Sequence, residues 1–384
     1  MSITNKIFCT APFTTLKIES HSKRGIIFKP GCVYSAQSNV SSLDSYLHGQ
    51  EMVDHRHNLL TGDTPSVGCT LCSDPEKMGL TSIRKQLLKK SWASDQQSIK
   101  MLDVFFSNTC NLGCLMCDPE FSSYIANEQF NIGELNQHIK IKDNIDVVLD
   151  IMDKLPDLEC ITFLGGEFFF FKSNEKILEK IIEKKLKCTV TTNCTIASGN
   201  LYEKLKRVDK IEFRFSVDGV GPVNDFIRYP SKWDHIENNI KQFRQDFKNA
   251  EKFVTTVVQP LNLQFLPELF EWANKLFLPV HLQIISSPKK LSWEILTVDE
   301  RRKILDSLEV SKFKLTKQQL QFFDEICIGI FKPEFSSDTR KQGIKFLSKM
   351  LTHRKYCTDN IKKQFGILED LCREVIEEMN NENV

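Results

Sequence analysis

Six short apolar runs, rich in β-branched and aromatic residues, alternate with helical patterns from about residue 100 onward. The runs occupy residues 102–107, 160–164, 188–192, 211–217, 253–258 and 280–285. Helical patterns lie between them at 143–155, 174–184, 200–208, 233–247 and 266–276. Such alternation is typical of βα units, which build a parallel sheet covered by helices. The sequence therefore predicts the α/β class, with too few repeats for a closed eight-stranded barrel.

Three cysteines follow the first of these runs in a C-x3-C-x2-C spacing, at Cys110, Cys114 and Cys117. Thiolates from one short loop can hold three irons of a cubic 4Fe-4S cluster and leave the fourth iron without a protein ligand. Soft sulfur ligands select iron-sulfur clusters or zinc over hard cations. Zinc is the alternative, although structural zinc sites take four ligands and usually pair C-x2-C with a second pair. Residues 110–117, called the cysteine loop below, are therefore a candidate metal site.

Two glycines and a carboxylate follow the second run, at Gly165, Gly166 and Glu167. Glycine allows the backbone to approach a ligand closely, and a carboxylate can receive an ammonium group. A Gly-Gly-Glu segment taken alone is a common turn. At the carboxyl end of a strand in an α/β barrel, however, it stands where functional groups gather.

Polar residues also follow the third and fourth runs. Asn193 comes after the third run, where capping the next turn is its default behaviour. The fourth run ends in Ser216 and Asp218, and Arg228 follows ten residues later. A β-turn at Asp218 and a solvated surface charge at Arg228 are the ordinary interpretations of these residues.

Taken in this order, the motifs resemble those of the radical S-adenosylmethionine (radical SAM) superfamily. The resemblance implies a partial (β/α)6 TIM-like barrel that binds S-adenosylmethionine beside a 4Fe-4S cluster. Glu167 would bind the amino group of the cofactor, while Ser216 and Arg228 would engage its methionyl carboxylate and ribose. Met116 would cover the adenine in place of the usual aromatic residue, and Phe168 replaces the usual proline. The cofactor-binding residues that the resemblance implies are Met116, Gly165, Gly166, Glu167, Asn193, Ser216, Asp218 and Arg228.

Four more cysteines lie near the N-terminus, at Cys9, Cys32, Cys69 and Cys72. Short apolar runs at 16–18 and 26–28 predict a hairpin that brings Cys9 and Cys32 together, and a helical pattern at 43–60 follows. Four thiolates suit either zinc or a second 4Fe-4S cluster.

The same segment resembles the N-terminal module of twitch and SPASM-like radical SAM proteins, with Glu76, Gly79, Ser82 and Arg84 after the cysteines. That resemblance implies an auxiliary 4Fe-4S cluster. The chain departs from the family in having one cysteine, Cys32, where a pair is common.

The remaining patterns divide the chain into three parts: a small cysteine-rich module at 1–97, the partial barrel at 98–290 and a helical C-terminal extension at 291–384. Helices are expected in the extension at 298–308, 317–331, 339–351 and 360–379. The aromatic run 168–171 is expected to pack in the core between helix and sheet, and a substrate-facing aromatic wall is the alternative. The scattered cysteines are expected to be small core hydrophobes: Cys160, Cys188, Cys194, Cys327, Cys357 and Cys372.

Composition narrows the function classes. The formal charge of +1 does not indicate nucleic-acid binding. Neither a secretory signal nor a membrane-spanning run is evident, so a soluble, cytoplasmic protein is expected. Thirteen cysteines in a reducing compartment favour metal ligands and buried thiols over disulfides.

Three functions follow as hypotheses. The first is a radical SAM enzyme that reductively cleaves S-adenosylmethionine to a 5′-deoxyadenosyl radical, which abstracts hydrogen from a peptide or protein side chain. The resemblance implies a one-electron donor of the flavodoxin or ferredoxin type as its partner. The second hypothesis is the same chemistry on a small molecule, sugar or nucleotide. The third is a non-catalytic protein with zinc at both cysteine sites.

Overall fold

The computed structural model describes residues 7–32, 40–62, 67–77, 82–285, 287–309 and 334–382. It divides into two compact units. Unit 1 comprises Met1–Asn108, Lys140–Thr191 and Ser198–Glu212, and unit 2 comprises Thr109–Ile139, Thr192–Ala197 and Phe213–Val384. The expected helix at 317–331, together with Cys327 and Gly79, lies outside the described residues.

Eight strands form one sheet in the order β2-β1-β3-β4-β5-β6-β7-β8. Their bounds are β1 Thr15–His21, β2 Gly25–Lys29, β3 Met101–Phe105, β4 Cys160–Phe163, β5 Lys187–Thr192, β6 Ile211–Ser216, β7 Glu251–Val258 and β8 Val280–Ile284. The neighbouring strands from β1 through β3 and β4 to β5 pair in parallel, as do β7 and β8. The α/β class and all six expected strands after residue 100 are confirmed.

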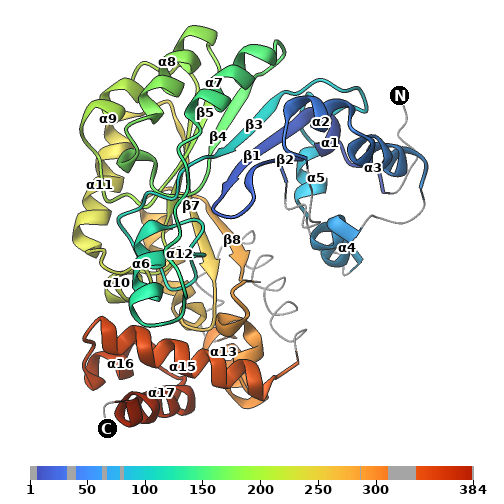
Figure 1. Cartoon of the computed structure of the whole chain (residues 1–384). Helices are drawn as coiled ribbons and strands as arrows, with labels where there is room; N and C mark the ends of the chain where they lie inside the picture. The colour runs from blue at the N-terminus through green and yellow to red at the C-terminus, as the bar shows by residue number, and fades with distance from the viewer. Residues whose placement is uncertain are drawn as a thin grey trace. The chain divides into compact units, whose positions relative to one another are not determined.

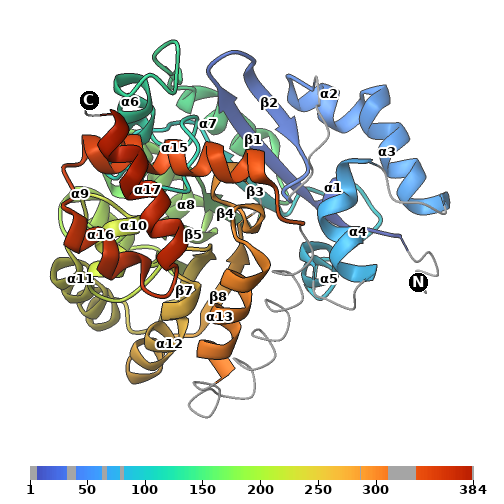
Figure 2. The ribbon, with the colours of Figure 1, turned by 90° about the horizontal axis from the view of Figure 1, so that it is seen from below.

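The N-terminal hairpin extends this sheet. Strands β1 and β2 pair antiparallel, as expected, and β1 also pairs in parallel with β3 (Figure 2). The sequence did not indicate this second pairing, because a short apolar run predicts a strand but not its partner. The hairpin is thus continuous with the sheet, and the boundary at residue 97 stays a prediction.

Unit 1 also contains helices. They are α1 Ala11–Thr14, α2 Leu43–His48, α3 Gln50–Thr61, η1 Val67–Cys69, α4 Thr70–Lys77, α5 Ile83–Leu87, α7 Ile145–Lys154, η2 Phe168–Phe170, α8 Asn174–Lys184 and α9 Asn200–Leu205. The expected single helix at 43–60 is two helices, because Gly49 takes an extended conformation between α2 and α3.

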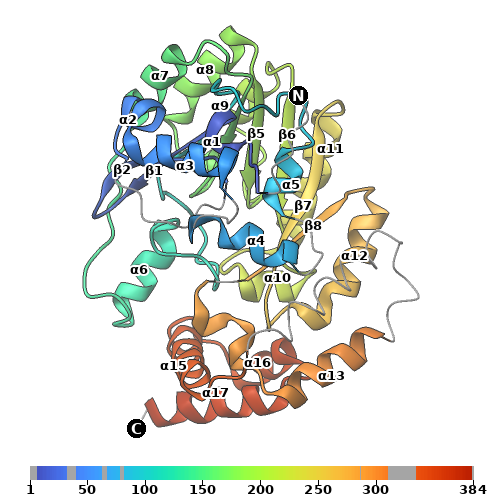
Figure 3. The same ribbon diagram turned by 90° about the vertical axis from the view of Figure 1, so that its right-hand side faces the viewer.

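The helices of unit 2 include the C-terminal extension. They are α6 Ser123–Asn131, α10 Pro222–Ile227, α11 Trp233–Asp246, η3 Leu263–Phe265, α12 Leu266–Lys275, η4 Lys289–Leu291, η5 Trp293–Ile295, α13 Val298–Glu309, α15 Ser337–His353, α16 Thr358–Phe365 and α17 Glu369–Glu382. In the extension, α17 packs against both α15 and α16 (Figure 3). The expected single helix at 360–379 is wrong, because Gly366, with φ of +54°, separates α16 from α17. Within the described residues, no helix is both long and apolar enough to span a bilayer.

Aromatic side chains of β6 pack against an aromatic side chain of α11, a helix of unit 2 (Figure 1). Phe213 and Phe215 project from the same face of β6 and are fully buried. Phe243 of α11 lies against both rings, with centroids 5.0 Å from Phe213 and 5.5 Å from Phe215. This packing fixes the strand whose carboxyl end carries Ser216 and Asp218.

The predicted burial of the aromatic run and of the scattered cysteines is confirmed only in part. Phe168 and Phe169 are buried in the core as expected, whereas Phe170 is 48% exposed. Cys188, Cys194 and Cys372 are buried and Cys160 is half-buried, but Cys357 is exposed, so core burial is wrong for that residue. Cys357 lies in the segment that connects α15 to α16, and connecting segments usually run over the protein surface.

Candidate functional site

The cysteine loop is held by backbone hydrogen bonds to the end of α10. The Gly113 N–H donates to the Tyr229 carbonyl at 2.7 Å, and the Leu115 N–H donates to the Ile227 carbonyl at 2.9 Å. These two bonds flank Cys114 on the loop and Arg228 on the opposite segment. The two residues are therefore brought face to face by the backbone itself.

Arg228 is buried and reaches both a thiol and a carboxylate. Its Nη1 atom lies 3.9 Å from the Cys114 Sγ atom, and its Nε atom lies 2.7 Å from Asp218 Oδ2. Burial lowers the pKa of Arg228, but Asp218 and Cys114 outweigh that effect and raise the pKa above its usual value. A solvated surface charge is therefore the wrong interpretation of Arg228.

Asp218 is completely buried after β6 and is fixed from several sides. Its Oδ1 atom accepts a hydrogen bond from the Val257 N–H at 2.7 Å, and its carbonyl accepts one from Asn262 Nδ2 at 2.9 Å. Its own N–H donates to Asn224 Oδ1 at 3.1 Å. Asp218 thus ties the end of β6 to β7 and presents one carboxylate oxygen to Arg228.

Asn193 uses its side chain to hold the cysteine loop. Its Nδ2 group donates to Asn111 Oδ1 at 2.9 Å, and Asn111 Nδ2 donates to Thr195 Oγ1 at 2.8 Å. The Oδ1 atom of Asn193 also accepts from the Thr195 N–H at 3.0 Å, which is the turn-capping behaviour expected of asparagine. Sequence reasoning missed Asn111 and Thr195 as members of the site, because Asn111 is one of the variable positions between the cysteines and Thr195 follows the motif residue Asn193.

The three thiols of the cysteine loop lie in one electrostatic neighbourhood. Burial raises the pKa of Cys117 well above its usual value, and Cys114 and Cys110 raise it further. Burial also raises the pKa of Cys114, while Arg228 and Arg354 oppose that rise. In the described part of the chain, no group of three or more His, Cys, Asp or Glu side chains converges closely enough to hold a metal ion. In ligand type, although not in this arrangement, the three thiols suit an iron-sulfur cluster, because cysteine thiolates are its usual ligands.

The Gly-Gly-Glu segment belongs to unit 1 and has the backbone that its glycines predict. Gly165 and Gly166 have φ values of +72° and +54°, and a Cβ on Gly165 would lie 1.9 Å from the Phe105 ring. The segment therefore requires glycine at residue 165. Glu167 is buried, and its Oε1 atom accepts a hydrogen bond from the Phe169 N–H at 3.3 Å.

The N-terminal cysteines also gather within unit 1. Cys9 is buried with Cys32 packed against its cluster. Burial raises the pKa of Cys9 to about 12, and the nearby Cys69 and Cys72 add to this rise. Cys69 ends η1 and Cys72 lies in α4, so the C-x2-C pair is helical. All four predicted ligands therefore belong to one region of unit 1.

A hydrogen-bonded triad of Glu76, Ser82 and Arg84 lies beside this cysteine region. Arg84 Nε donates to Glu76 Oε1 at 3.0 Å, Arg84 Nη1 donates to the Phe8 carbonyl at 2.8 Å, and Ser82 Oγ donates to Glu76. Glu76, Ser82 and Arg84 are the residues that the sequence singled out after Cys72. The contact with Phe8, which precedes Cys9, places the triad directly against the N-terminal cysteine region.

The cofactor-binding roles of Met116 and Ser216 stay predictions. Both side chains are half-buried.

Sequence reasoning missed Arg354, which contacts the cysteine loop at the Gly113 carbonyl and pairs with Glu128. Flanked by His353 and Lys355, Arg354 looks in the sequence like a solvated charge, and only its burial reveals the contact.

One family model matches part of the chain. Residues 104–273 match the family model described as the radical SAM superfamily. No curated protein matches the chain.

Solved structures with partial similarity include anSMEcpe with bound AdoMet, at 15% identity and a TM-score of 0.40, covering 60% of this chain and 62% of that chain. Streptococcus suis SuiB bound to precursor peptide SuiA shows 15% identity and a TM-score of 0.39, over 72% of this chain and 53% of that chain. SuiB bound to S-adenosylmethionine shows 14% identity and a TM-score of 0.39, over 77% and 69%. The chain thus spans 62% of the length of anSMEcpe.

Proposed function

We infer that the chain is a radical SAM enzyme, which reductively cleaves S-adenosylmethionine. The premise is the match of residues 104–273 to the family model of the radical SAM superfamily. A 4Fe-4S cluster would supply the one electron that breaks the C5′–S bond of S-adenosylmethionine, which gives methionine and a 5′-deoxyadenosyl radical that abstracts hydrogen from a substrate. A flavodoxin or ferredoxin would supply the electron. Cys110, Cys114 and Cys117 would hold the cluster, as three thiolates of one loop suffice for three irons.

The observation that carries this proposal is the contact between Arg228 and Cys114. Arg228 lies 3.9 Å from the thiol and is held by Asp218, so one buried cation stands beside a predicted cluster ligand. A buried cation favours the thiolate form of a nearby cysteine, which is the form that binds iron. Asn193 supports the same loop through Asn111.

The remaining predicted cofactor residues are assigned by their chemistry. Glu167 would receive the ammonium group of the cofactor, and it follows two glycines, Gly165 and Gly166, whose left-handed backbone suits residues without a side chain. Ser216 and Arg228 would engage the carboxylate and ribose, and Met116 would cover the adenine. Asp218 would act indirectly, by orienting Arg228.

We propose a second 4Fe-4S cluster at Cys9, Cys32, Cys69 and Cys72. The shared neighbourhood of these cysteines in unit 1 supports this proposal. For the substrate we propose a peptide or protein side chain, because twitch-type modules, which the first hundred residues resemble, frequently accompany enzymes that modify peptides.

Metal and sulfide analysis after anaerobic reconstitution tests the cofactor assignment. Two cubic clusters predict about eight irons and as many labile sulfides per chain. The C110A/C114A/C117A variant should keep about half of them, and a matched C9A/C69A/C72A variant should keep the other half. Zinc without labile sulfide in the parent chain would overturn the proposal in favour of a non-catalytic zinc protein.

A further inference from the structure

Arg354, at the end of α15 in the C-terminal extension, is a completely buried guanidinium within unit 2. It forms a two-pronged ion pair with Glu128 of α6, with Nε 3.0 Å from Oε1 and Nη2 2.7 Å from Oε2. Removing both charges from water is costly, so a buried pair of this kind is weak evidence for stability alone. Its position is the more informative feature.

The same guanidinium contacts the cysteine loop directly. Its Nη2 group also donates a hydrogen bond to the carbonyl of Gly113, the residue before Cys114. Its central carbon lies 4.7 Å from the centre of the Tyr229 ring, and the Tyr229 carbonyl accepts the Gly113 N–H. Arg354 therefore contacts both the loop and the segment to which the loop is hydrogen-bonded.

Gly113 is packed too tightly for any side chain. A Cβ there would lie 2.3 Å from Glu128 Oε2, 2.7 Å from Tyr124 and 3.1 Å from Arg354 Nη2. The backbone of the loop is thus pressed against the ion pair, and the loop conformation depends on where that pair stands.

We propose that Arg354 is a positioning residue through which the C-terminal helices fix the conformation of the cysteine loop. Its importance for the cluster rests on the proposed function, whereas the ordering of the loop is a property of the chain alone. The extension thereby becomes part of the site rather than a separate covering layer.

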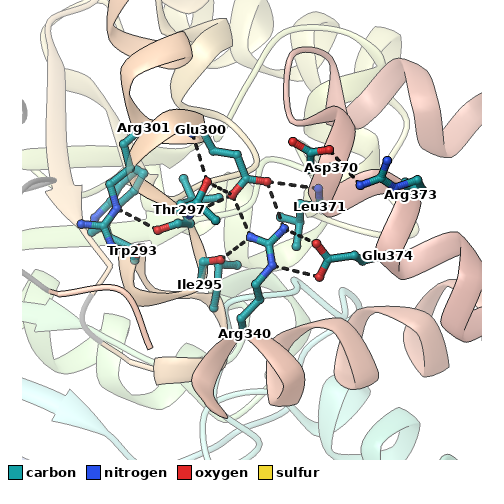
Figure 4. A network of polar contacts seen from close by, with 11 residues as sticks. Trp293, Ile295, Thr297, Glu300, Arg301, Arg340, Asp370, Leu371, Arg373 and Glu374 are labelled. Carbon is teal, nitrogen blue, oxygen red and sulfur yellow. Dashed lines mark hydrogen bonds and ion pairs between the residues drawn. The ribbon is translucent and has the colours of Figure 1, made fainter. Parts of the chain in front are cut away.

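Arg340 provides a matched control from the same helix α15. It is also buried, it pairs with Glu300 at 2.7 Å and Glu374 at 2.7 Å, and it donates to the Ile295 carbonyl (Figure 4). These partners lie in η5, α13 and α17, and none belongs to the cysteine loop. Loss of Arg340 should weaken the extension without removing a contact to the loop.

Hydrogen exchange on the full chain before reconstitution tests the proposal without any cluster. In R354Q, amides of a peptide spanning residues 109–118 should exchange at least tenfold faster than in the parent chain, and in R340Q they should be unchanged. R354K, which keeps the charge but loses the two-pronged geometry, should lie between R354Q and the parent. Unchanged exchange in both Arg354 variants, or equal acceleration in R340Q, would overturn the proposal.

Electron paramagnetic resonance of the reconstituted, reduced protein gives a second readout. An altered cluster signal in R354Q with a parental signal in R340Q is expected, whereas parental signals in both variants would count against the proposal. If the parent chain takes up no iron and sulfide, the proposed function fails, but the exchange result still decides the role of Arg354. If the parent cleaves S-adenosylmethionine and R354Q exchanges normally, only the role of Arg354 fails.

Discussion

Replacement of Arg228 by methionine should destabilise the chain because it strands a buried carboxylate. Asp218 is fully buried, and its Oδ2 atom lies 2.7 Å from Arg228 Nε. Methionine fills much of the same volume but leaves the charge of Asp218 uncompensated. Breaking a buried ion pair on one side costs about 3–5 kcal/mol. That is a large part of the roughly 5–15 kcal/mol that stabilises an ordinary domain.

The magnitude can be assigned to charge by a double-mutant cycle. D218N keeps an oxygen to accept the Val257 N–H, so D218N/R228M removes both charges while keeping that hydrogen bond. Replacing both members of a buried pair is often nearly neutral. We therefore expect the double variant to recover most of the stability that R228M loses.

Urea unfolding of the chain before reconstitution measures these differences, with the slope of the transition monitored to check that one cooperative step is followed. Equal losses in R228M and in D218N/R228M would refute the reasoning, because the cost would then come from lost packing rather than from an unpaired charge. Both variants should lose binding of S-adenosylmethionine if Arg228 contacts the cofactor.

Two further predictions concern stability outside the cysteine loop. Burial raises the pKa of Glu300, but hydrogen bonds from Arg340 outweigh this and hold the pKa below its usual 4.5. A lowered folded-state pKa contributes stability above the unfolded-state value and loses it as pH falls, so urea midpoints between pH 7 and 3 should fall less steeply in E300Q than in the parent. G165A should cost about 2–5 kcal/mol, from left-handed backbone strain plus the clash with Phe105, whereas G133A, with φ of +71° and open space around it, should cost only about 1–2 kcal/mol. Equal losses in the two glycine variants, by urea unfolding, would contradict the clash.

Much of the fold could be predicted because its signals are local. Apolar runs and helical periodicity located all six strands after residue 100 and placed α8 at residues 174–184. The two helices predicted as continuous are each divided by a glycine, Gly49 and Gly366, which a periodic pattern does not exclude. The pairing of β1 with β3 could not be foreseen, because pairing joins residues distant in sequence.

The candidate site was likewise predictable from local motifs but not in its contacts between distant residues. Motif order singled out Arg228 and Asp218 as separate candidates, and only the structure shows that they form an ion pair beside Cys114. Asn193 was expected to bind a cofactor or cap a turn; its side chain does cap the turn, and it also joins that turn to the cysteine loop. Arg354 carried no signal, because its partners Glu128 and Gly113 lie more than two hundred residues away in sequence.

Formation of 5′-deoxyadenosine from S-adenosylmethionine under reducing, anaerobic conditions tests the central claim most directly. The reconstituted parent chain should form it, and the C110A/C114A/C117A variant should form none. The matched C9A/C69A/C72A variant should retain cleavage, because its cysteine loop is intact. Cleavage that survives loss of all three loop cysteines would contradict the assignment of the cluster to this loop.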